Sequence, residues 1–224
     1  MAKLILLRHL KSQWNLENRF TGWVDVPLAK DNINKTKAIS KTIFKFKIDK
    51  IYSSPLFRNQ ESVLKILNYT KKYPIFTYLD NNKMNKWGNF KEINKNYFPV
   101  YISESLNERY YGKLQGEKKK DIMKKYGKEK THLWRRGFEN NPPNGESLSD
   151  TFKRTIPFYC KYIEKDINQG KNVLIVASHN ALRSLVKYIE KIPDRHIINV
   201  EIPYAGIIKY EFYDSLKLKN KKIL

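Results

Sequence analysis

The sequence predicts an α/β fold, a three-layer sandwich in which helices flank a mostly parallel central sheet. Two continuous apolar runs, residues 4–7 and 173–177, have the length and composition of buried strands. Further strands are expected at residues 48–53 and 207–212, the second being the last strand of the chain. Amphipathic stretches with apolar side chains at helical spacing separate these strands. Strands that alternate with helices are typical of a parallel sheet covered on both faces.

The helices are placed by their apolar spacing and by their start signals. Two helices are expected over residues 33–46 and 117–136. Three more are expected to begin at local start signals: at the cap Ser54 with Pro55 in the first turn, at the capping-box sequence 147–150, and after residue 179. Pro157 interrupts the helix that follows residue 147 and predicts a kink or a break. Residues 70–105 indicate an irregular excursion, with short strands near 75–76 and 100–101. We expect all 224 residues to form a single domain.

Composition limits the cellular setting. Hydrophobic residues make up 41% of the chain, enough for a core, but no run reaches the 18 or so apolar residues that a membrane span needs. The apolar run before Arg8 is too short for a signal peptide. The lone cysteine, Cys160, cannot form an internal disulfide, which favours a reducing cytoplasm. We therefore predict a cytoplasmic protein without a membrane partner.

The formal net charge of +22 has two interpretations, an anion-binding role and a general preference for lysine. Lysine is spread along the whole chain, whereas a nucleic-acid footprint would form one stripe. The densest clusters are residues 118–120 and the tail lysines at 217, 219, 221 and 222, which we interpret as solvated faces. The sequence predicts no nucleic-acid partner.

Two of the four histidines follow predicted strands. His9 comes after the strand at residues 4–7, and His179 comes after the strand at 173–177. Ligands of open α/β sheets bind beyond the carboxyl ends of the strands, so the two imidazoles are predicted to share a site. Either histidine alone would more simply be structural, as we interpret His132 and His196.

Arginines accompany the two histidines. Arg8 precedes His9, and Arg58 falls near the start of a predicted helix, where free N–H groups favour an anion. Each arginine alone would be an ordinary surface charge, but the set could hold a phosphoryl group while a neutral imidazole attacks phosphorus. Glu108 is the candidate general acid and base, the alternative being a plain ion pair with Arg109. No metal-ligand spacing is present in the sequence.

Several motifs, distributed over nearly the whole chain, resemble those of one family. They are Leu7-Arg8-His9, Ser12-Gln13-Trp14-Asn15, the run from Asn18 to Asp25, the run from Leu106 to Gly112, Leu114-Gln115-Gly116, Trp134-Arg135-Arg136, Gly145-Glu146-Ser147-Leu148, and His179 with Leu182-Arg183. Together they resemble the cofactor-dependent phosphoglycerate mutases of the histidine phosphatase superfamily. The resemblance implies a phosphoglycerate mutase-like fold and a homodimer or homotetramer.

The resemblance also implies roles for individual residues. His9 would be the phosphorylated nucleophile and Glu108 the acid and base, while Arg8, Arg58 and His179 would hold the phosphoryl group. Other polar positions would line the site or bind the substrate: Ser12, Asn15, Thr21, Gly22, Tyr111, Lys119, Arg135, Arg136 and Asn180. The implied reaction interconverts 3-phosphoglycerate and 2-phosphoglycerate without a metal. The implied cofactor, 2,3-bisphosphoglycerate, is both primer and intermediate.

The chain departs from the family pattern in several places. Leu10 stands where the family has glycine, and the segment after His179 is one residue shorter, so that Asn180 replaces either the Gly or the Asn of His-Gly-Asn. Residues 202–206 replace Ile-Pro-Thr-Gly with a longer run. These differences leave two alternatives open: a phosphatase of the same superfamily acting on a small phosphorylated metabolite, and an inactive relative that binds anions or proteins.

Overall fold

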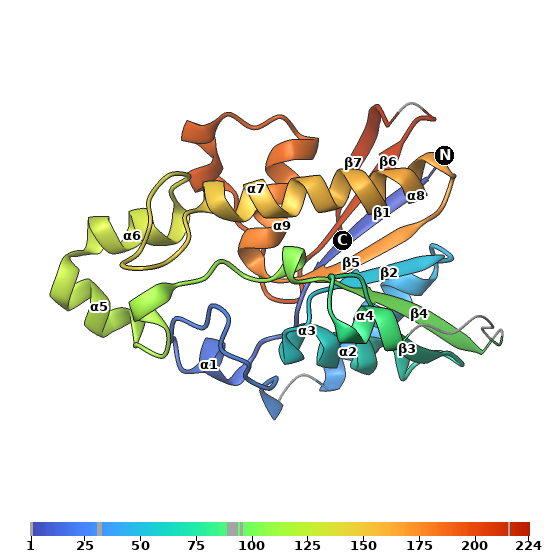
Figure 1. Cartoon of the computed structure of the whole chain (residues 1–224), viewed down its shortest axis with the longest axis horizontal. Coiled ribbons are helices and arrows are strands. Elements are labelled where there is room, and N and C mark those ends of the chain that lie inside the picture. Colours follow the sequence, from blue (N-terminus) through green and yellow to red (C-terminus); the bar gives the residue numbers. More distant parts are fainter. Residues whose placement is uncertain (1, 31–32, 89–93, 95, 215) are drawn as a thin grey trace.

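The computed structural model describes residues 2–30, 33–88, 94, 96–214 and 216–224 (Figure 1). Within these residues seven strands form one sheet in the order β3-β4-β2-β5-β1-β6-β7. The strands are β1 (Lys3–Arg8), β2 (Lys50–Ser53), β3 (Tyr73–Tyr78), β4 (Tyr97–Ile102), β5 (Val173–Ala177), β6 (Ile207–Phe212) and β7 (Leu218–Ile223). The first five strands in this order pair in parallel, whereas β6 pairs antiparallel with both β1 and β7. The mostly parallel sheet is confirmed.

Helices cover both faces of the sheet. They are α1 (Gln13–Leu16), α2 (Ile33–Phe44), α3 (Phe57–Leu67), α4 (Lys83–Trp87), α5 (Lys119–Tyr126), α6 (Lys128–Arg136), α7 (Leu148–Phe158), α8 (Lys165–Asn168) and α9 (His179–Ile189). In Figure 1, α7 and α9 lie on one face of the sheet, and α2 and α3 lie on the other. This is the predicted three-layer sandwich. The helices α5 and α6 extend beyond one end of the sheet, past the carboxyl end of β1.

The alternation of side chains along β1 explains the layers. Leu4 and Leu6 are fully buried in the core cluster that includes residues of α7 and α9. Ile5 and Leu7 are fully buried in the other cluster, together with residues of α2 and α3. Successive side chains of a strand point to opposite faces, so a continuous apolar run fits a strand buried on both sides. Burial of each such side chain is worth about 1.5–3 kcal/mol.

Several predicted elements differ from the structure. The excursion at residues 70–105 is more regular than expected, because β3, α4 and β4 extend the sheet, although residues 89–93 and 95 lie outside the described part. The predicted helix at 117–136 is two helices, divided at Gly127, whose φ of 85° breaks the helical path. A further strand, β7, follows the predicted last strand and pairs with it.

Helix starts and interruptions follow local chemistry. Ser147 caps α7 in a full capping box with Asp150, as predicted. In contrast, α3 begins only at Phe57, and Ser54 does not cap it. Pro157 lies inside α7, and a wider π-helical turn over residues 159–164 follows before α8. A proline removes one helical hydrogen bond and crowds the preceding turn, which accounts for the interruption.

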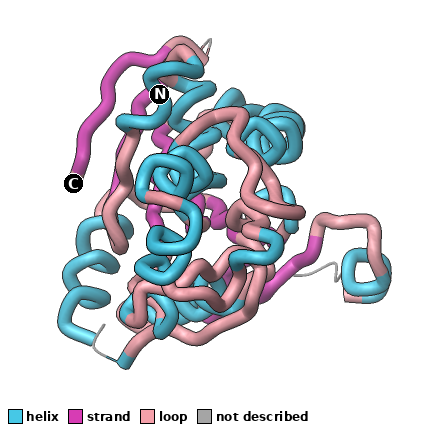
Figure 2. The backbone as a smooth tube through the Cα atoms, turned by 90° about the vertical axis from the view of Figure 1, so that its left-hand side faces the viewer, coloured by secondary structure: helices cyan, strands magenta, loops and turns pink. Residues whose placement is uncertain are grey.

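The C-terminal strand β7 forms one edge of the sheet and runs along the outside of the molecule (Figure 2). Its side chains from Lys219 to Ile223 are exposed. Lysines on an edge strand discourage pairing with another sheet, so this lysine cluster has a structural reason to be charged.

Candidate active site

Three neighbouring parallel strands bring the predicted residues to one place. β5 lies between β1 and β2, with Arg8 paired with Ala177 and Ser53 paired with Val176. His9 directly follows β1, and His179 is the first residue of the helix after β5. Because parallel strands end at the same edge of the sheet, residues 170 positions apart in the sequence become neighbours.

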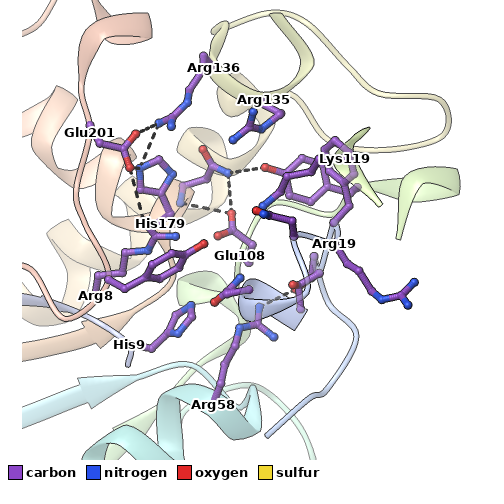
Figure 3. Close-up of a pocket in the computed structure, with 18 residues that line it drawn as sticks. Arg8, His9, Arg19, Arg58, Glu108, Lys119, Arg135, Arg136, His179 and Glu201 are labelled. Carbon is purple, nitrogen blue, oxygen red and sulfur yellow. Dashed lines mark hydrogen bonds and ion pairs between the residues drawn. The ribbon is translucent and has the colours of Figure 1, made fainter. Parts of the chain in front are cut away.

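A pocket of about 250 Å³ opens at this edge (Figure 3). It is lined by Arg8, His9, Asn15, Asn18, Arg19, Phe20, Thr21, Gly22, Arg58, Glu108, Tyr111, Lys119, Arg135, Arg136, His179, Asn180, Glu201 and Tyr204. Of these, six are Arg or Lys and only two are Glu, so the pocket favours an anion. The hydroxyl of Thr21 is buried without a hydrogen-bond partner in the structure, a free group for a ligand oxygen.

Ser12 is the one predicted site residue that does not line the pocket. Its side chain is fully buried, and its hydroxyl caps α1 by accepting a hydrogen bond from the backbone N–H of Asn15 at 3.3 Å. Ser12 therefore supports Asn15, which does line the pocket, and the prediction of a direct contact is corrected.

His9 has the tautomer that a nucleophile needs. Its Nδ1 lies 2.6 Å from the carbonyl oxygen of Leu10. Because a carbonyl only accepts, Nδ1 carries the proton and Nε2 keeps its lone pair. Burial, followed by the charges of Arg58 and Arg8, lowers the pKa of His9 well below its usual value. The imidazole is therefore neutral at pH 7.

Leu10 does not crowd the pocket. Its side chain is fully buried in the core cluster on the α2 and α3 face. Its backbone N–H donates to the hydroxyl of Ser62 at 3.0 Å, and its backbone does not adopt the positive φ that would favour glycine. The substitution of glycine by leucine is thus accommodated by the core.

Arg8 and Arg58 are held by backbone carbonyls. Arg8 donates through Nη1 to Ile202 at 2.6 Å, and Arg58 donates through Nη2 to Gly22 at 2.7 Å. Burial lowers the pKa of Arg58 to about 10, so it remains charged at pH 7. Fixed cations of this kind stabilise charge without reorganising during a reaction.

Glu108 lies between the two histidines and is fixed by Asn180 (Figure 3). Its Oε1 accepts from the side-chain amide of Asn180 at 2.7 Å and from the backbone N–H of Arg109 at 2.7 Å. The guanidinium of Arg109 points elsewhere and donates to the carbonyl of Arg135 at 2.6 Å. The alternative of a simple Glu108–Arg109 ion pair is therefore wrong, and the carboxylate faces the pocket.

Two buried arginines support the pocket wall from behind. Arg109 and Arg183 are both fully buried, and they donate to the backbone carbonyls of Arg135 and Arg136 at 2.6 and 2.7 Å. Arg183 also donates to the side-chain oxygen of Asn180 at 2.9 Å. These contacts set the backbone from which the Arg135 and Arg136 side chains extend into the pocket.

The pocket also contains residues to which the sequence assigned no role. They are Asn18, Arg19, Phe20, Glu201 and Tyr204. The first three belong to the run from Asn18 to Asp25, in which the sequence assigns roles only to Thr21 and Gly22, and the Arg19 side chain points away from the centre (Figure 3). Glu201 and Tyr204 come from the loop before β6, which folds back over the end of β1. No sequence signal marked that loop beyond its unusual length.

Among the described residues, no group of three or more His, Cys, Asp or Glu side chains is arranged to hold a metal ion. No helix within the described ranges is long and apolar enough to cross a membrane.

Comparison with known proteins shows the family to which the chain belongs. The family model of the histidine phosphatase superfamily (branch 1) matches residues 4–93 and 89–220. A protein of Methanococcus vannielii named 2,3-bisphosphoglycerate-dependent phosphoglycerate mutase is 43% identical over 222 residues, covering 98% of this chain and 94% of the relative. A protein of the same name from Chlamydia muridarum is 40% identical, covering 98% of both chains.

Solved structures share the fold at lower identity. A mycobacterial glucosyl-3-phosphoglycerate phosphatase solved with VO3 superposes with a TM-score of 0.76 at 18% identity, covering 100% of this chain and 97% of that one. Bacillus stearothermophilus YhfR gives a TM-score of 0.75 at 21% identity, covering 98% and 95%. These likenesses concern the fold alone.

The matched family model and the pair of histidines at neighbouring strand ends define the class: the chain belongs to branch 1 of the histidine phosphatase superfamily. Within that superfamily it belongs to the family of 2,3-bisphosphoglycerate-dependent phosphoglycerate mutases, as the identity to full-length relatives shows.

Proposed function

We propose that the chain interconverts 3-phosphoglycerate and 2-phosphoglycerate through a phosphoryl group carried on Nε2 of His9. The observation that carries the proposal is the neutral, buried His9 with a free Nε2, set in a pocket of six cations beside a carboxylate. Family membership at about 40% identity supports the mutase over other phosphoryl-transfer reactions.

In the first step the Nε2 lone pair of His9 attacks a phosphorus of 2,3-bisphosphoglycerate, and the leaving alcohol is a monophosphoglycerate. A P–N bond forms while the P–O bond to the leaving alcohol breaks. Arg8, Arg58 and His179 stabilise the charge on the transferring oxygens. Glu108 in its protonated form gives its proton to the leaving oxygen, which departs as a hydroxyl.

The second step reverses the first at the free hydroxyl of a bound monophosphoglycerate, which thereby becomes 2,3-bisphosphoglycerate. Glu108, now a carboxylate, takes the proton of the incoming hydroxyl. The oxygen attacks phosphorus, the P–N bond breaks, and Nε2 recovers its lone pair. Transfer of the other phosphoryl group of this bisphosphate to His9, by the first step again, completes the interconversion. One carboxylate thus serves both directions, and its position between His9 and His179 (Figure 3) suits both roles.

The outer cations bind the parts of the substrate that do not react. Lys119, Arg135 and Arg136 line the pocket with Tyr111, whose hydroxyl lies 3.2 Å from the side-chain nitrogen of Asn180. They would hold the carboxylate and the second phosphate. 2,3-Bisphosphoglycerate would supply the phosphoryl group that primes His9, and the excess of cations together with the unpartnered Thr21 hydroxyl fits such a highly charged ligand.

The affinity for 3-phosphoglycerate should fall as the pH rises through about 8. Burial, followed by the charges of Arg135, Arg8 and Arg136, lowers the pKa of Lys119 to about 8, so the ammonium is charged below that pH and neutral above it. The second pKa of a phosphate monoester is about 6, so the ligand keeps its charge from about pH 7 to about pH 9.5. Calorimetric titration over that range checks the expectation. The Lys119→Gln variant should bind 3-phosphoglycerate more weakly, and its affinity should change less with pH. Parallel pH profiles for the variant and the wild type would contradict the role of Lys119.

One assay tests the proposed reaction. The protein is incubated with 3-phosphoglycerate, with and without 2,3-bisphosphoglycerate, and 2-phosphoglycerate is followed through enolase. Product stimulated by the bisphosphate supports the mutase. Free phosphate without 2-phosphoglycerate would instead indicate the phosphatase, and neither product would indicate the inactive binding relative.

Three further properties remain predictions. We propose that the chain acts in the cytoplasm, that it needs no metal, and that it forms a homodimer or homotetramer. Activity after treatment with a chelator checks the second, and light scattering coupled to size-exclusion chromatography checks the third.

A further inference from the structure

The second carboxylate of the pocket, Glu201, lies among the cations. Its Oε2 forms an ion pair with Arg136, and its Oε1 lies 3.6 Å from Nη1 of Arg8 and 3.4 Å from Nε2 of His179 (Figure 3). The side chain of Glu201 is 50% exposed, whereas those of Arg8 and His179 are only 10% exposed. A half-exposed anion therefore contacts two buried groups.

The surroundings of His179 show what Glu201 does there. Nε2 of His179 is approached by Nη1 of Arg136 at 3.5 Å and by the backbone N–H of Ile202 at 3.4 Å, both of which are donors. In the ligand-free protein Nε2 therefore accepts from these donors. To hold a phosphoryl oxygen, Nε2 must instead carry a proton, and of its three neighbours only the Glu201 carboxylate could accept a hydrogen bond from that N–H.

The guanidinium of Arg8 also faces the Glu201 carboxylate. Its Nη1 has two hydrogens, and one is donated to the carbonyl of Ile202. Glu201 faces the same nitrogen. A phosphoryl oxygen that accepted from both Nη1 of Arg8 and Nε2 of His179 would lie where Oε1 of Glu201 lies in the ligand-free protein.

We propose that Glu201 is an internal competitor of the phosphorylated ligand: its carboxylate occupies part of the phosphoryl position in the free protein and is displaced outward when the ligand binds. The residue would thereby lower the affinity for phosphate groups and hasten their release. The Glu201 carboxylate also balances the positive charges of Arg8 and Arg136 when no ligand is bound. The inference rests on the phosphoryl-binding site of the proposed function but not on the mutase reaction.

The electrostatic cost of leaving Glu201 in place is appreciable. A carboxylate about 4 Å from a doubly charged phosphate repels it even in water, and salt weakens this repulsion. Removing the charge while keeping the shape should therefore tighten phosphate binding about tenfold at low ionic strength, which corresponds to about 1.4 kcal/mol.

The test is calorimetric titration of inorganic phosphate into the wild type, Glu201→Gln and Glu211→Gln. Glu211 pairs with Lys209 on β6 at 2.7 Å and does not line the pocket, so its variant makes the same change in net charge elsewhere. We expect the Kd of phosphate to fall about tenfold in Glu201→Gln and to change less than about twofold in Glu211→Gln. The difference should shrink with added salt.

Thermal unfolding gives a second measurement. The ligand-free Glu201→Gln variant should unfold at a lower temperature than the wild type and should gain more stability from phosphate. If it does not fold without phosphate, Glu201→Asp, which keeps the charge but is shorter, should show a smaller gain in affinity. Unchanged or weaker phosphate binding in both variants would overturn the inference. Absence of binding in the wild type would instead contradict the proposed site.

Discussion

Replacing His9 with alanine should abolish mutase activity, with a loss of about 10⁴-fold or more. The expectation follows from the geometry, because Nδ1 of His9 is committed to the Leu10 carbonyl and Nε2 is the only nitrogen of the ring left to attack phosphorus. The same variant should accept no label when it is incubated with radiolabelled 2,3-bisphosphoglycerate. In the wild type, an acid-labile and base-stable phosphohistidine should form.

A second histidine variant provides the control for this experiment. His132 is exposed on α6 and does not line the pocket. His132→Ala should therefore keep both the activity and the label. A label retained by His9→Ala would show that another residue is the nucleophile, and the proposed first step would fail.

The centre of the site was predictable because it depends on a simple rule of topology. Parallel strands end at one edge of the sheet, so a polar residue after each of two apolar runs has a defined place. His9, His179 and Arg58 needed only that rule and the positions of the strands. The register of β1, β5 and β2 then brought them together as expected.

The surroundings of the site depend on contacts that the sequence does not encode locally. Arg109 and Arg183 support the backbone of Arg135 and Arg136 across 26 and 47 positions of the chain. Glu201 reaches the pocket because its loop crosses the end of β1. Such side chains look like ordinary charges in the sequence, since their partners are fixed only by the tertiary fold.

The missed elements of the fold have a similar explanation. β7 reads as a lysine-rich polar tail because an edge strand outside the core needs little apolar patterning. Gly127 divides α5 from α6 through a positive φ, whereas an isolated glycine in a helical pattern is often tolerated.

The two departures from the family pattern, Leu10 beside His9 and Asn180 beside His179, have different structural consequences. Leu10 moves into the core and leaves His9 undisturbed. Asn180, in the shortened segment, places its amide on Glu108 and its backbone N–H 3.3 Å from the same carboxylate oxygen. The deletion therefore acts on Glu108, the proposed acid and base, whose orientation depends on the first turn of α9.

Replacing Glu108 with glutamine should slow the interconversion about 10²- to 10⁴-fold while leaving the fold intact. An amide oxygen can still accept from Asn180 and from the Arg109 N–H, so the hydrogen bonds that fix the side chain at 2.7 Å can persist. The amide cannot give or take the proton of the reacting oxygen. Phosphate binding should remain or become tighter, because one negative charge leaves a cationic pocket. Steady-state kinetics and phosphate titration separate the two effects.

The identity of the leaving group sharpens this last prediction. A phosphoryl donor with an acidic alcohol, such as an aryl phosphate, needs little help from a general acid when it phosphorylates His9. Glu108→Gln should therefore lose much less activity with that donor than with 3-phosphoglycerate. Glu117→Gln, at an exposed position outside the pocket, should behave as the wild type with both. An equal loss for both donors would mean that Glu108 shapes the pocket without transferring the proton.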